Sequence, residues 1–128
     1  MKQFRLLAYE DDPDWKEGFE FNVKPKLSSK GVNITIVQKL DDSTLMQDLE
    51  WLPNLILVDF DLGDRTGVEI IEQINGDPQY VNTSVFFYSG GESIEKLKSI
   101  AEGFVCGITC FTKEGEELEN AVILKGQA

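Results

Sequence analysis

Asp59 is the residue whose position most strongly suggests chemistry, because it ends an apolar run and a turn follows at once. Residues 55–58 read Leu-Ile-Leu-Val. In α/β proteins, ligands bind in the crevice outside the carboxyl ends of the strands. Asp61 and Asp64 can already serve the turn, so a turn role does not account for Asp59. We therefore predict that Asp59 is a reactive group.

Two further acids, Glu10 and Asp11, directly follow another apolar run at residues 4–9. If the two runs are neighbouring parallel strands, their three carboxylates converge and repel one another unless a cation or a proton intervenes. Mg²⁺ suits such a site, because one or two carboxylates bind it together with water, a carbonyl and a phosphate oxygen. We therefore expect Mg²⁺ at this edge.

A hydroxyl and an ammonium group follow two more apolar runs. Ser89 precedes Gly90 and Gly91, and Lys113 follows residues 108–112. Ser-Gly-Gly alone is an ordinary turn, whereas a lysine near a helix start opposes the helix dipole and is slightly informative. Together with Asp59, the serine and the lysine could form a cradle for a phosphoryl group.

The elements that must position these groups alternate along the chain. Strands are predicted at residues 4–9, 33–39, 55–59, 84–88 and 108–112, and helices at residues 13–24, 42–51, 66–75, 93–104 and 114–124. Apolar rather than alternating strands predict a parallel sheet covered on both faces. Right-handed crossovers favour a five-stranded doubly wound parallel sheet of order 2-1-3-4-5, a flavodoxin-like three-layer sandwich. We expect residues 1–128 to form a single domain.

The first helix has the least regular sequence. Asp12 is predicted to cap it, with Pro13 at its first position. Apolar residues recur every four positions from Trp15, but Pro25 should end or kink the helix near Lys24. We therefore expect a break before residues 26–30.

The composition excludes several classes of function. The chain has no histidine, which removes histidine-based catalytic triads, histidine metal sites and phosphohistidine carriers. A net charge of -11 disfavours binding to nucleic acid or to anionic membranes. No apolar run approaches the roughly 20 residues that cross a bilayer. Cys106 and Cys110 are expected to be buried free thiols, and with no apparent signal peptide this predicts a cytoplasmic protein.

The chain resembles the receiver domains of two-component response regulators, including the chemotaxis regulators, over almost its whole length. The matching positions are residues 10–14, Val58-Asp59 with Gly67 eight residues later, Ser89-Gly90 and Lys113. Each piece alone is weak. Five functional positions in the right order, at the right strand ends, make the resemblance specific.

The resemblance implies a phosphorylation switch. Asp59 would take a phosphoryl group from a phosphohistidine of a sensor histidine kinase or a histidine phosphotransfer protein. The implied Mg²⁺ ligands are Asp11, Glu10 partly through water, Asp59 itself and the backbone carbonyl of Asp61. Ser89 and Lys113 would bind the phosphoryl oxygens, and the switch would change the affinity for a downstream protein target. Such a protein catalyses only its own phosphorylation and dephosphorylation.

Three positions depart from the family pattern. Glu114 stands where a proline usually follows the lysine. Cys110 stands where an aromatic residue is common, with Phe111 beside it pointing the other way. We hypothesise that backbone and fourth-helix movement conveys the switch instead. Asp61, two residues after the acceptor, is predicted to set the lifetime of the phosphoryl group, by orienting water or by repelling it, and Gly91 leaves the opposite flank open.

Two other functions remain in view. A pseudo-receiver would keep the fold and bind a partner constitutively without being phosphorylated, and Cys110 and Glu114 leave room for it. Alternatively, the motif Asp59-Phe60-Asp61 resembles the first motif of haloacid dehalogenase phosphohydrolases. Gly63 stands where that motif has Thr or Val, and about seventy remaining residues leave little room for that larger fold.

Overall fold

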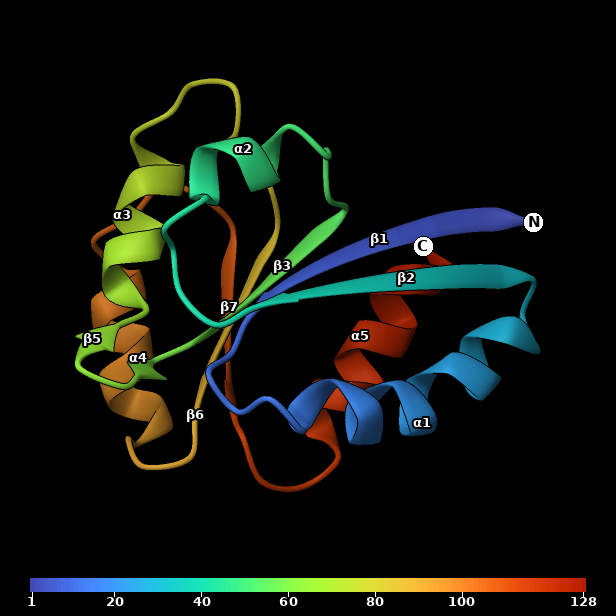
Figure 1. Ribbon diagram of the computed structural model, residues 1–128. Helices are drawn as coiled ribbons and strands as arrows, with labels where there is room; N and C mark the ends of the chain where they lie inside the picture. Colours follow the sequence, from blue (N-terminus) through green and yellow to red (C-terminus); the bar gives the residue numbers. More distant parts are fainter.

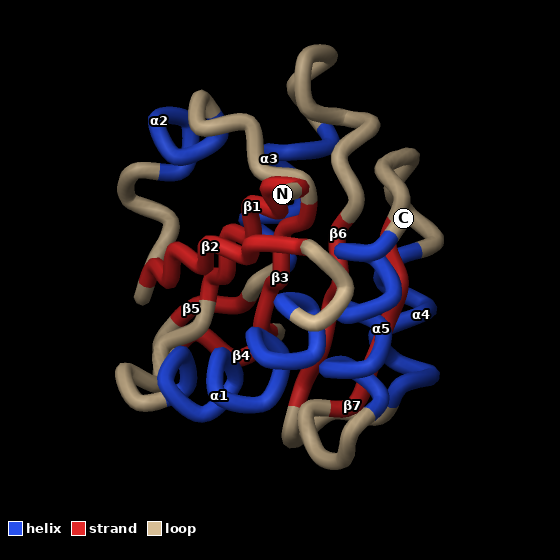
Figure 2. Tube along the Cα trace, turned by 90° about the vertical axis from the view of Figure 1, so that its right-hand side faces the viewer, coloured by secondary structure: helices blue, strands red, loops and turns tan.

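A five-stranded parallel sheet lies between two layers of helices (Figure 1). The computed structural model describes residues 1–128. The strands are β1 (Lys2–Tyr9), β2 (Val32–Lys39), β3 (Leu55–Asp59), β6 (Val85–Ser89) and β7 (Ile108–Thr112). They follow one another in the order β2-β1-β3-β6-β7 (Figure 2). Every neighbouring pair is parallel. Since β6 and β7 are the fourth and fifth strands of this sheet, the predicted order 2-1-3-4-5 is confirmed.

Each face of the sheet has its own hydrophobic core. In β3, Leu55 and Leu57 point into the core on one face, and Ile56 and Val58 into the core on the other. This alternation follows from the period of two of a β-strand, and both sets are apolar because both faces are covered. The residues of β3 that precede Asp59 are therefore packed on both faces of the sheet, and this packing fixes the position of the site.

The helices divide between the two faces. They are α1 (Trp15–Ser28), α2 (Leu45–Leu49), α3 (Val68–Asn75), α4 (Ile94–Ala101) and α5 (Glu117–Gln127). Helices α1 and α5 cover one face, and α2, α3 and α4 cover the other (Figure 1). The middle three are shorter than predicted, whereas α5 both begins and ends three residues later than predicted. None of the helices has the length and apolar character needed to cross a bilayer.

Helix α1 continues through Pro25 to Ser28, so the predicted end near Lys24 and the break after it are wrong. Pro25 is exposed, and so is Phe21, whose carbonyl has no N–H to accept from at position 25. On the opposite side Val23 and Leu27 are fully buried, and this packing outweighs the cost of the proline.

The start of α1 also differs from the prediction. Asp14 occupies the cap position, whereas Asp12 and Pro13 lie in a turn before the helix. The side chain of Asp12 accepts a hydrogen bond from the backbone N–H of Asp14 at 2.9 Å. Asp12 thus stabilises the turn that leads into the helix instead of capping the helix itself.

A small hairpin that the sequence did not indicate follows the candidate acceptor. Strands β4 (Asp61–Leu62) and β5 (Arg65–Thr66) pair antiparallel, and Gly63 at their turn has a φ of 71°. A Cβ atom at Gly67 would overlap the backbone carbonyl of Asp59. Glycine is required there because α3 starts directly against the end of β3.

Candidate functional site

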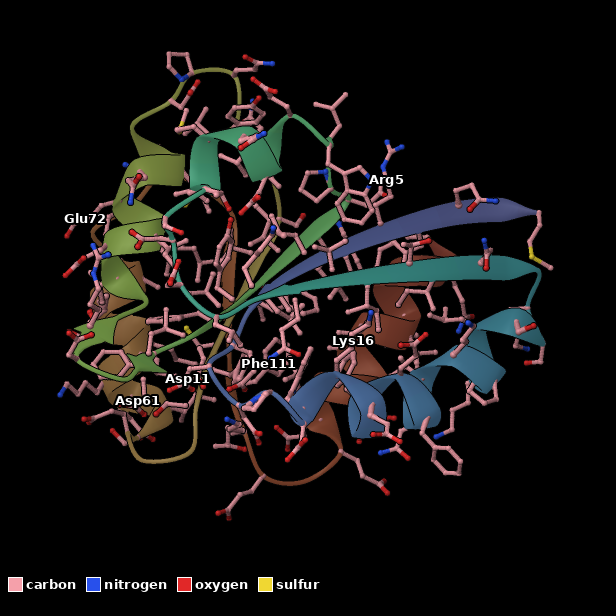
Figure 3. All side chains as sticks on the ribbon, in the orientation of Figure 1. Arg5, Asp11, Lys16, Asp61, Glu72 and Phe111 are labelled. Carbon is pink, nitrogen blue, oxygen red and sulfur yellow. The ribbon has the colours of Figure 1, made fainter.

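Three acids meet at the carboxyl ends of β1 and β3. Oxygen atoms of Glu10, Asp11 and Asp59 all lie within 4.8 Å of one another. Adjacent parallel strands β1 and β3 cause this convergence: Tyr9 pairs with Val58, so the next residues, Glu10 and Asp59, follow side by side. Glu10 and Asp59 are 0% and 2% exposed, whereas Asp11 is exposed. Figure 3 labels Asp11 and Asp61 at this end of the sheet.

Lys113 extends from the end of β7 toward the two buried acids. Its Nζ atom lies 2.8 Å from Glu10 Oε1 and 3.2 Å from Asp59 Oδ2. The backbone N–H of Lys113 donates to the carbonyl of Ser89 at 2.9 Å, which continues the β6–β7 pairing into the loop. Lys113 therefore reaches the site with Glu114, and not a proline, after it.

Tyr88 belongs to this group, although the sequence indicated only an apolar strand position. Its hydroxyl donates to Glu10 Oε1 at 3.1 Å, and the backbone N–H of Asp12 donates to Glu10 Oε2 at 3.0 Å. Both oxygens of the fully buried carboxylate are thus satisfied. One signal was available: a tyrosine near the end of a buried strand needs a partner for its hydroxyl.

Burial dominates the electrostatics of the site. Burial and the charge of Glu10 raise the pKa of Asp59 to about 7, against lowering by the backbone N–H of Asp61 and by Lys113. Burial would lower the pKa of Lys113, but the hydrogen bond to Glu10 and the negative charges of Asp59 and Glu10 raise it. Burial and the nearby acids also raise the pKa of Tyr88. Asp59 consequently takes up a proton far more readily than a solvated aspartate.

Ser89 lies on the other side of Asp59 and faces Asp61. Its hydroxyl donates to Asp61 Oδ2 at 3.1 Å and accepts from the backbone N–H groups of Gly91 and Glu92 at 3.1 and 3.0 Å. The backbone N–H of Asp61 donates to Asp59 Oδ1 at 3.0 Å. The structure thus brings Ser89 and Asp61 beside the acceptor, but it pairs them with each other. The role of the Asp61 carbonyl as a ligand stays a prediction.

The three acids fit a hard divalent cation. All potential ligand atoms are oxygens, and the buried carboxylates of Glu10 and Asp59 share only one lysine, so negative charge remains uncompensated. Mg²⁺ prefers carboxylate oxygens and retains several waters, which the exposed position of Asp11 allows.

The residues before Lys113 alternate as the sequence indicated. Phe111 packs on Phe86, with ring centroids 4.9 Å apart, on the face covered by α1 and α5. Cys110 points to the opposite face and packs in the core with α4. Cys106 and Cys110 are both buried free thiols, which confirms that prediction.

No protein-family model and no curated protein matches the sequence. Solved structures do match. Chemotaxis protein CheY4 of Vibrio cholerae has a TM-score of 0.70 at 17% identity, over 96% of this chain and 97% of that one. A putative response regulator from Chloroflexus aurantiacus has a TM-score of 0.69 at 16% identity, over 99% of this chain and 100% of that one.

The Mn²⁺-bound form of response regulator Rcp1 has a TM-score of 0.63 at 19% identity, over 94% of this chain and 89% of that one. Further matches of the same kind include receiver domains from other bacteria. Structural matches at such low sequence identity indicate a shared fold, and the order of strands in the sheet is consistent with this fold. The chain therefore has the fold of the response-regulator receiver domains.

Proposed function

We propose that the protein is a phosphoaccepting receiver domain. Asp59 takes a phosphoryl group from a phosphohistidine of a sensor histidine kinase or histidine phosphotransfer protein, with Mg²⁺ as the cofactor. The phosphorylated form then changes its affinity for a downstream protein target. The carrying observation is the placement of Asp59 at a strand end, 2% exposed and 3.2 Å from Lys113 Nζ, within 4.8 Å of two further acids.

In the proposed transfer, a carboxylate oxygen of Asp59 forms a bond to phosphorus as the P–N bond of the phosphohistidine breaks. The electron pair of that bond stays on the leaving imidazole of the partner. Bound Mg²⁺ supplies positive charge for the oxygens of the transferring group. Lys113, held by Glu10, keeps its ammonium beside the attacking carboxylate and can pair with a phosphoryl oxygen.

Three separate observations support the proposed donor, the proposed compartment and the proposed cofactor. The chain has no histidine, so the phosphohistidine must belong to another protein. The free thiols of Cys106 and Cys110 agree with a reducing compartment, and we place the protein in the cytoplasm. The metal-bound neighbour Rcp1 supports a cation at the acidic edge, as does the set of oxygen ligands.

The two rival functions are less well supported. A pseudo-receiver has no need of a buried acid whose charge is offset by a lysine, because such a charge costs stability without a phosphorylation role. A phosphohydrolase would turn over phosphate esters as substrates, whereas the proposed protein modifies only itself.

Binding of beryllofluoride, which mimics a phosphoryl group on aspartate, tests the proposal. Calorimetry should detect beryllofluoride binding only when Mg²⁺ is present, and the substitution Asp59→Asn should abolish this binding. Asp48→Asn is a matched control, since Asp48 is a largely buried acid that lies away from the site and is bonded to Tyr9. Constitutive partner binding without any Mg²⁺-dependent beryllofluoride binding would identify a pseudo-receiver instead.

A further inference from the structure

The hydroxyl of Ser89 has its full complement of hydrogen bonds before any phosphoryl group is present. A serine hydroxyl has one proton and two acceptor lone pairs. The proton is donated to Asp61, and the lone pairs accept from the backbone N–H groups of Gly91 and Glu92. Ser89 is 2% exposed, so water does not readily replace these partners.

Asp61 contacts both the acceptor and the serine. Its backbone N–H bonds to Asp59 Oδ1, while its carboxylate accepts from Ser89. The hairpin that carries Asp61 is tied down by Arg65, which lies 2.6 Å from Asp42 Oδ1 and also bonds to Glu69. The carboxylate of Asp61 is therefore held in place opposite Ser89.

We propose that Asp61 competes with the phosphoryl group for the one hydroxyl proton of Ser89. The Ser89–Asp61 hydrogen bond is then a latch, which holds the unphosphorylated conformation and must open before Ser89 can bind a phosphoryl oxygen. This inference rests on the proposed function of Asp59. It makes Asp61 a positioning residue that acts through Ser89.

Opening the latch exchanges one charge-assisted hydrogen bond for another, so the net driving force is small and depends on Asp61. The movement of Ser89 also reaches α4. Glu92, whose N–H bonds to the Ser89 hydroxyl, pairs with Lys96 in the first turn of α4, and Lys96 lies over the ring of Phe60. When the hydroxyl of Ser89 moves away from the N–H groups of Gly91 and Glu92, the loop directly before α4 loses these two hydrogen bonds.

A double-mutant cycle tests the latch, with the Kd of beryllofluoride in saturating Mg²⁺ as the readout. Asp61→Ala should tighten binding roughly tenfold, which equals about 1.4 kcal/mol, because Ser89 no longer has to be released. In a Ser89→Ala background, the same Asp61→Ala substitution should leave the Kd unchanged. Equal tightening in both backgrounds would mean that Asp61 acts by charge repulsion alone, and it would overturn the latch.

Asp61→Asn separates the charge from the hydrogen bond. An asparagine oxygen still accepts from Ser89, although less strongly than a carboxylate. We expect Asp61→Asn to tighten binding less than Asp61→Ala does. Equal effects of the two variants would again indicate repulsion and contradict the latch.

Amide hydrogen exchange separates failure of the latch from failure of the proposed function. In the protein without Mg²⁺ or beryllofluoride, Asp61→Ala should raise the exchange rates of the Gly91 and Glu92 amides, because the unanchored hydroxyl of Ser89 changes rotamer. Unchanged rates would overturn the latch. If wild-type protein binds no beryllofluoride, the proposed function is overturned, and the proposed competition for Ser89 is overturned as well. This holds even if exchange shows that the Ser89–Asp61 bond exists.

Discussion

The two flanks of Asp59 are built differently. On one flank, which we call the buried flank, Glu10, Tyr88 and Lys113 form a network in which Glu10 is 0% exposed. On the flank toward the β4–β5 hairpin, the open flank, exposed Asp61 bonds to Ser89. The comparison indicates that one flank positions the acceptor and that the other can rearrange.

The physical reason for this division is the cost of breaking each set of contacts. Separating a buried ion pair leaves an uncompensated charge away from water, which is strongly unfavourable. The hydrogen bond between Ser89 and Asp61 involves one exposed carboxylate, which water can solvate once the hydroxyl of Ser89 has found another acceptor. A switch therefore belongs on the open flank, and changes on the two flanks should differ in kind.

The largest effect is expected for Lys113→Ala on the buried flank. Removing the ammonium leaves the buried carboxylates of Glu10 and Asp59 without their cation, and we expect a loss of about 2–3 kcal/mol in the free energy of unfolding. Beryllofluoride binding should be lost as well. Urea denaturation at neutral pH measures the first effect. Lys96→Ala, which breaks an exposed pair with Glu92, should cost less than about 1 kcal/mol.

Asp59→Asn should stabilise the metal-free protein by about 2 kcal/mol at about pH 8. The pKa of Asp59 is raised from 3.8 to about 7 in the folded state. A raised carboxyl pKa contributes stability at low pH, which is lost as the pH rises through the folded value. The difference between variant and wild type should thus be near zero at about pH 4 and complete above pH 7. A constant difference at all pH values would contradict this origin.

Mg²⁺ affinity should increase with pH for the same reason. Below the raised pKa of Asp59, which is about 7, a cation must displace a proton, so its affinity should rise about tenfold per pH unit. Above that pKa the affinity should level off. Calorimetry in buffers of different ionisation enthalpy would count the released proton. A pH-independent affinity between about pH 5 and 8 would show that the carboxylate is already ionised.

Tyr88→Phe should cost about 1 kcal/mol and weaken beryllofluoride binding, because Glu10 loses the hydrogen bond that helps it to hold Lys113. Tyr9→Phe is the matched control. The hydroxyl of Tyr9 donates to Asp48 at 2.8 Å, outside the site, so this variant should lose similar stability without any change in binding. Equal binding losses in both variants would indicate a general effect of stability.

The smallest effect is expected for Arg65→Ala on the open flank. The arginine side chain is 48% exposed, so its ion pairs with Asp42 and Glu69 should contribute about 0.5 kcal/mol or less. Because the hairpin then holds Asp61 less firmly, beryllofluoride binding should tighten about twofold, in the direction opposite to Lys113→Ala. Weaker binding would contradict the division into two flanks.

The convergence of Glu10, Asp11, Asp59 and Lys113 could be predicted from the sequence. The apolar runs give the strands, right-handed crossovers restrict their order to a few arrangements, and the carboxyl ends of parallel strands share one edge. These arguments concern backbone topology. They hold even though the individual helix boundaries were wrong by up to four residues.

The finer contacts could not be predicted because they depend on side-chain geometry. The hydroxyl of Tyr88 indicated that it needs a partner, but the strand pattern does not show which buried acid it reaches. The pairing of Ser89 with Asp61 required the β4–β5 hairpin, whose two-residue strands lack a periodic pattern. Pro25 misled because helix packing outweighed its local preference.

Phosphorylation at Asp59 is the central claim, and mass spectrometry after incubation with a small phosphodonor such as acetyl phosphate tests it most directly. The account predicts that the intact protein gains the mass of one phosphoryl group only when Mg²⁺ is present, and that Asp59→Asn prevents the gain. Wild-type protein that stays unmodified with Mg²⁺ and excess donor, or a modification that persists in Asp59→Asn, would contradict it.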